Sequence, residues 1–84
     1  MTIPNSITEI QYYTFFDCTK LTSVVISDSV TCIDMFSFAG CTNLTSIFYM
    51  GTTEQWQAIK LGTKWNENTP ATVVQCFDGD VPIQ

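Results

Sequence analysis

An internal repeat constrains this chain more than any other feature, because residues 3–25 and 26–48 are two copies of one unit. Ten of the 23 positions hold the same residue in both copies. A period of roughly 20–29 residues is typical of stacked arrays, in which each unit buries its apolar face only against a neighbouring unit. We therefore expect the two copies to stack, with equivalent residues side by side.

Length and composition limit the chain to one small domain with a single core. Its 84 residues are 45% hydrophobic and only 13% charged, which favours a globular fold over disorder. The net charge is −5, so we expect no binding to nucleic acid, whose phosphates would be repelled. No segment approaches the roughly 20 apolar residues needed to cross a bilayer, and the N-terminus lacks the basic and apolar regions of a signal peptide. We expect no membrane insertion.

Each copy contains two predicted extended segments. The spacing Leu21-x-x-Val24-x-Ile26, repeated from Leu44, predicts a strand, and a second extended segment covers residues 7–10 and 30–33. The aromatic residues at 13–15 and 36–38 fit a single helical turn between the two segments. The predicted core is Ile7, Ile10, Phe15, Cys18, Leu21, Val24 and Ile26, with their second-copy partners Val30, Ile33, Phe38, Cys41, Leu44 and Ile47.

The repeat pattern ends near Met50, and the remainder of the chain is predicted to be a cap. Thr52 and Gln55 have the spacing of a capping box, which predicts a helix over about residues 53–61 with Lys60 in its last turn and Gly62 as its stop. A final strand is expected over residues 72–76, ended by Asp78-Gly79. A different closing element is expected because the last repeat would otherwise leave an open sheet edge.

The cysteines leave two interpretations open. Cys18 and Cys41 occupy the same repeat position, so stacking would place them roughly 5 Å apart, within reach of a disulfide bond. We favour the alternative, in which buried thiols act as small apolar groups. The chain has no histidine and no Cys-x-x-Cys pair, so we expect neither a metal site nor a cofactor.

The repeat unit, I-P-x-S-[IV]-T-x-I-x-x-x-x-F-x-x-C-T-x-L-T-S-[VI], followed by the segment from Tyr49 to Trp56, resembles the BspA-like leucine-rich repeat proteins over nearly the whole chain. The fold that we expect is a β-rich α/β leucine-rich-repeat solenoid forming a single domain over residues 1–84. It has two 23-residue coils at 3–25 and 26–48, and a C-terminal cap at 49–84 with one short helix and a final strand. The resemblance implies protein binding or adhesion at a bacterial cell surface rather than catalysis.

The candidate partner-binding site is a strip of outward side chains on the two predicted strands. Stacking would place Ser23 beside Ser46, Val25 beside Phe48, and Ser27 beside Met50. Solenoids commonly bind proteins through such rows. The competing interpretation is that the cap helix covers Phe48 and Met50. Without histidine, acid–base or nucleophilic chemistry would lack its usual partner, so we expect no enzyme.

Two further expectations depend on how the chain occurs. As part of a longer protein it would be extracellular or on the cell surface, whereas a free-standing chain would be cytoplasmic. In that second case the acidic charge suits a small inhibitor, of the kind that phages and mobile elements encode, which binds a basic nucleic-acid enzyme.

The first coil also has apolar edges with no preceding coil to cover them, which predicts self-association through the N-terminal coil.

Overall fold

The computed structural model describes residues 1–83, so residue 84, the last of the predicted cap, lies outside it. The elements in chain order are β1 (Glu9–Ile10), β2 (Ser23–Ile26), β3 (Cys32–Ile33), β4 (Ser46–Tyr49), α1 (Thr53–Gln57), β5 (Lys60–Leu61), β6 (Val73–Cys76) and β7 (Gly79–Pro82). Short strands therefore dominate the fold, and the helix is brief.

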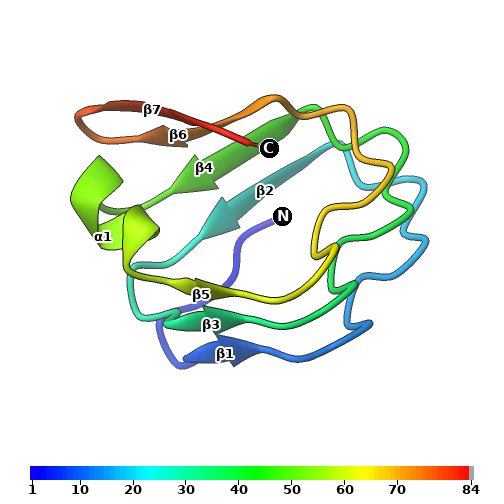
Figure 1. Ribbon diagram of the computed structural model, residues 1–84, viewed down its shortest axis with the longest axis horizontal. Coiled ribbons are helices and arrows are strands. Elements are labelled where there is room, and N and C mark those ends of the chain that lie inside the picture. The colour runs from blue at the N-terminus through cyan, green and yellow to red at the C-terminus, as the bar shows by residue number, and fades with distance from the viewer. Residues whose placement is uncertain (84) are drawn as a thin grey trace.

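The strands form two sheets, and the chain alternates between them (Figure 1). One sheet has the order β1-β3-β5, and the other has the order β2-β4-β6-β7. We call each strand of the first sheet, together with the strand of the second sheet that follows it, a pass. Strands of successive passes pair in parallel, and only the last pair, β6 and β7, is an antiparallel hairpin.

The first two passes have the register that the repeat predicts. Val24 of β2 pairs with Ile47 of β4, and Ile10 of β1 pairs with Ile33 of β3, so each residue meets its equivalent in the next copy. Period-two alternation within β2 and β4 then buries Val24, Ile26 and Ile47 together. The predicted strand register is confirmed.

The C-terminal segment forms a third pass, which the sequence interpretation missed. Ile47 pairs with Val74 of β6, and Ile33 pairs with Leu61 of β5, and both steps along the chain are longer than one repeat unit. The helix α1 lies between β4 and β5, and this insertion lengthens the step from the second pass to the third. The segment called a cap thus continues both parallel ladders before the β6–β7 hairpin ends one of them.

The start of the predicted helix is confirmed and its end is wrong. Thr52 caps α1: its hydroxyl accepts from the Gln55 N–H at 3.2 Å, and its own N–H donates to Gln55 Oε1 at 2.9 Å. The helix ends at Gln57, because Lys60 joins β5 and its N–H donates to the carbonyl of Thr31. Competition from this ladder bond, which no local pattern reveals, shortens the helix.

Gly62 has a different role from the predicted helix stop. Its N–H donates to the Ile33 carbonyl at 2.7 Å, which extends the pairing of β5 with β3. A Cβ at this position would meet the backbone of Asp34 and lie 2.8 Å from the Met35 Cα. Glycine is therefore required by the close approach of two passes.

The core runs through all three passes and is densest in the second. Of the predicted core, Ile10, Val24, Ile26, Val30, Ile33, Phe38, Cys41, Leu44 and Ile47 are buried. Ile7 was expected in the core but is 37% exposed, and Phe15, Cys18 and Leu21 are only half-buried. These four residues belong to the first pass, which has a neighbour on one side only.

The four cysteines are free thiols. The Cys41 thiol donates to the carbonyl of Phe15 at 3.1 Å, and its burial raises its pKa above the ordinary value of 9.0. The favoured interpretation of buried thiols therefore describes Cys41, whereas Cys18 is only half-buried.

Candidate functional site

The outward side of the larger sheet carries a row of exposed apolar side chains. Val25 pairs with Phe48, as predicted, and Phe48 is 41% exposed while Met50 is 46% exposed. The helix α1 therefore leaves both residues accessible, and the interpretation in which it covers them is wrong. We call Val25, Phe48, Met50 and Phe77 the strand face.

Phe77 is the member of the strand face that sequence reasoning missed. It follows Cys76, the last residue of β6, and is 70% exposed. The Phe77 N–H donates to the carbonyl of Gly51 at 2.9 Å. This bond places Phe77, in the third pass, beside Met50, which follows the second pass. Phe77 follows Met50 at the same interval at which Val74 follows Ile47, but only the strand pairing in the structure reveals that interval.

Ser27 does not belong to this surface. The sequence placed it beside Met50 on the exposed strip, but it is buried in the turn after β2. Its hydroxyl donates to Asn5 Oδ1 at 2.6 Å and accepts from the Ser29 N–H at 3.2 Å. Ser23 and Ser46 pair as predicted and are half-buried. The turn uses Ser27 to satisfy polar groups between the first two passes.

Carboxylates lie near the edges of the strand face. Burial raises the pKa of the Cys76 thiol, and the negative charges of Asp78 and Asp80 raise it further. Burial likewise raises the pKa of Tyr49, with a smaller contribution from Asp28. Asp78 also accepts from the Thr53 N–H at 2.8 Å, which ties the hairpin to the start of α1. In the sheet register, Gln75 pairs with Phe48 on one side and with Asp80 on the other, so one acidic residue lies two strands from Phe48.

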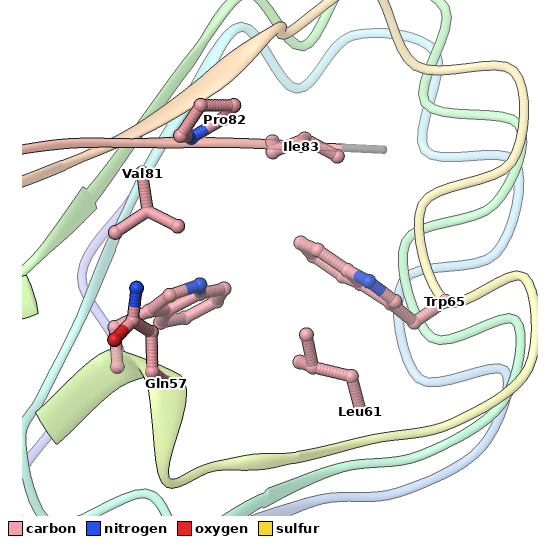
Figure 2. A pocket seen from close by; sticks show the side chains of 7 residues that line it. Gln57, Leu61, Trp65, Val81, Pro82 and Ile83 are labelled. Atoms are coloured by element: carbon pink, nitrogen blue, oxygen red, sulfur yellow. The ribbon is translucent and has the colours of Figure 1, made fainter. Parts of the chain in front are cut away.

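A second feature is a pocket of about 300 Å³ near the end of the third pass (Figure 2). Trp56 and Trp65 contribute nearly buried indoles whose ring centroids lie 5.8 Å apart. The lining consists of Trp56, Gln57, Leu61, Trp65, Val81, Pro82 and Ile83. It includes no ionisable or nucleophilic side chain, so this lining provides packing rather than chemistry.

A larger hollow of about 360 Å³ opens at the N-terminal side of the first pass. Its lining includes Ile3, Ile7, Ile10 and Phe15. The N-terminal residues cover part of the adjoining sheet edge, because Thr2 bridges Val25 in parallel and the Ile3 N–H donates to the Val25 carbonyl at 2.8 Å. The larger sheet is therefore partly closed at this end, while the apolar hollow beside β1 stays open.

The described part of the chain contains neither a cluster of metal ligands nor a membrane-crossing helix. Within residues 1–83, no group of three or more histidine, cysteine or acidic side chains is arranged to hold a metal ion. No helix in this part of the chain combines the length and apolarity needed to cross a bilayer.

Comparison with known proteins adds a family. The family model described as BspA type leucine-rich repeat region (6 copies) matches residues 1–60, which include the first two passes and α1. Searches of curated proteins and of solved structures returned no match.

Proposed function

The chain belongs to the BspA-type leucine-rich repeat family, and we propose that it is a non-catalytic module that binds a protein through its strand face. Repeats of this type suggest a protein-binding module. The finer proposal is that the three passes form a solenoid whose strand side is the binding surface, as stacked repeats use their extended faces.

The observation that supports this proposal most directly is the exposure of Phe48 in β4 and of Met50 and Phe77, which lie just beyond the ends of β4 and β6. Large apolar and aromatic side chains that gather on a surface, with a polar rim, mark protein interaction sites. Val25 extends the row by one pass. The parallel ladder fixes the spacing of these side chains before any partner arrives, so little ordering cost is left for binding.

Adhesion at a cell surface is the biological setting that we propose for this binding. If the chain is part of a longer protein, the strand face would contact a protein of a host or neighbouring cell. The position of Asp80 two strands from Phe48 and the net charge of −5 favour a partner with basic groups around an apolar centre.

The test uses the full chain, immobilised and exposed to a panel of purified extracellular proteins, with binding measured by biolayer interferometry. A protein that binds should lose roughly tenfold or more in affinity for the Phe48→Ser, Phe77→Ser double variant, because truncated aromatic anchors commonly cost about 2 kcal/mol or more. Leu61→Ser is the matched control, since Leu61 is an exposed apolar residue of β5 outside the strand face.

Equal affinity of the double variant and the parent chain for the same protein would contradict the assignment of the strand face. Attachment of beads coated with the chain to cells, lost with the double variant, would support adhesion. Attachment that the double variant retains would argue against it.

A further inference from the structure

Four aromatic side chains gather in the turns that connect the smaller sheet to the larger one. Tyr13 stacks on Phe36 with centroids 5.4 Å apart and ring planes 11° from parallel. Tyr12 and Phe16 meet Tyr13 edge to face, at 5.8 Å and 5.1 Å. Tyr12, Tyr13 and Phe16 are 44–60% exposed, and Phe36 is half-buried. We call these four residues the aromatic ridge, and it is separate in sequence from the strand face.

The backbone at the ridge is left-handed at three non-glycine residues, Tyr13, Asp17 and Phe36. Tyr13 has φ of 60° and Phe36 has φ of 55°, a left-handed conformation that is unusual for bulky residues. Gly40 adopts a similar conformation in the neighbouring turn of the second pass. A glycine would fit either aromatic position without strain. The same conformation recurs at Lys64, the equivalent residue of the third pass, with φ of 54°, so it belongs to the geometry of this turn. The rings of the ridge bury only part of their surface.

Charged residues of both signs lie close to the ridge along the chain, in a protein whose net charge is −5. Asp17 follows Phe16 directly, and Asp34 lies two residues before Phe36. Two lysines are also close along the chain or in register. Lys20 lies three residues after Asp17. Lys64 is the residue after Thr63, whose carbonyl accepts from the Phe36 N–H. The Lys64 ammonium is 3.8 Å from Glu67, which offsets its charge.

We propose that the aromatic ridge binds arginine side chains of a basic segment of a partner protein. A guanidinium is planar and weakly hydrated, so it stacks on aromatic faces more readily than an ammonium group does. The rings around Tyr13 stand at 74° and 82° to it, so they offer faces in more than one direction. The net charge of −5 favours a cationic group over an anionic one at this surface. This inference goes beyond the proposed function, because it assigns the chain a second binding surface and names the chemical group that this surface binds.

The experiment titrates the isotopically labelled full chain with a short blocked peptide of alternating glycine and arginine, followed by NMR chemical shifts at low salt. Peptides with lysine or with citrulline in place of arginine are the ligand controls, since citrulline keeps the shape of arginine and removes its charge. We expect the largest shifts at Tyr12, Tyr13 and Phe16, and affinities in the order arginine, lysine, citrulline.

The protein variants separate stacking on the rings from general charge attraction. Tyr13→Leu and Phe16→Leu keep an apolar side chain but remove the aromatic face. Each should weaken arginine-peptide binding roughly 2- to 5-fold, the range for an exposed cation–π contact. Tyr13→Phe keeps the face and should bind within about twofold of the parent chain. Circular dichroism of each variant confirms that it is folded.

Three results would overturn the proposal. The first is citrulline peptide binding as tightly as arginine peptide, and the second is leucine variants that bind like the parent. The third is a set of shifts confined to residues outside the ridge. The outcome of the strand-face test does not decide this one, because that test changes Phe48 and Phe77 whereas this one changes Tyr13 and Phe16.

Discussion

A pair of equivalent leucines provides a quantitative test of the stack. Leu44 in the second pass is fully buried, with the Ala71 N–H donating to its carbonyl at 3.0 Å from the third pass. Leu21 holds the same repeat position in the first pass and is only half-buried. Truncating each leucine to alanine removes the same atoms from two environments that differ in whether a preceding pass is present.

The expected costs follow from burial. Leu44→Ala should lower the free energy of unfolding by about 2–5 kcal/mol, the range for a fully buried leucine whose cavity does not collapse. Leu21→Ala should cost about half as much, roughly 1–2 kcal/mol, because its side chain already contacts solvent and the site opens outward. A domain of this size has roughly 4–13 kcal/mol of stability in total, so Leu44→Ala removes a large share of it.

The assay is urea unfolding of both variants, followed by circular dichroism and by tryptophan fluorescence. Trp56 and Trp65 lie in the third pass and report on its end of the core. A larger loss of unfolding free energy for Leu44→Ala than for Leu21→Ala would agree with a stack that is open at the first pass. Equal costs, or a larger cost for Leu21→Ala, would refute the reasoning, because they would mean that the first pass is covered as completely as the second.

Three other changes test separate contacts. Gly62→Ala should cost about 1–3 kcal/mol in urea unfolding, because the added Cβ lies 2.8 Å from the Met35 Cα; an unchanged midpoint would contradict that close approach. The free energy of unfolding should fall as pH rises past 9.0, by at most about 1.4 kcal/mol per pH unit for one thiol, because Cys41 ionises at a lower pH in the unfolded chain than in the folded chain. Cys41→Ala should make this fall shallower, and an equally steep fall in the variant would contradict the role of Cys41. The chain should self-associate at micromolar concentration through the hollow beside β1, and Ile7→Glu should restore monomers in light scattering; a monomeric parent chain would disprove this.

The first two passes were predictable because their identical residues all lie one repeat unit apart. Residues that share a repeat position must take the same place in successive passes, so the repeat spacing alone gave the pairing of Val24 with Ile47. The third pass has Ala71 and Val74 where the second has Leu44 and Ile47. Its different residues and the added helix removed both the identity and the spacing that mark a repeat.

The candidate surfaces were less predictable for two physical reasons. The strand face was partly visible, since alternation along a strand indicates which side chains point outward, but Ser27 lies where strand becomes turn and the alternation stops. The aromatic ridge was hidden because a run of aromatic residues in a short connection is normally core. The sequence gives no sign of the left-handed backbone at Tyr13 and Phe36, or of the exposure of Tyr12, Tyr13 and Phe16.

The two ends of the fold differ in a way that bears on both proposed surfaces. At the C-terminal side, β7 pairs antiparallel with β6 and reverses the chain, so the parallel register of the larger sheet does not continue past β6 in residues 1–83. At the N-terminal side, a single bridge from Thr2 to Val25 continues this sheet in the parallel sense. Any further pass in register would therefore add beside β1 and β2. Such a pass would extend the strand face beyond Val25 and the ridge beyond Tyr13, so the area of both surfaces would grow together from the same end.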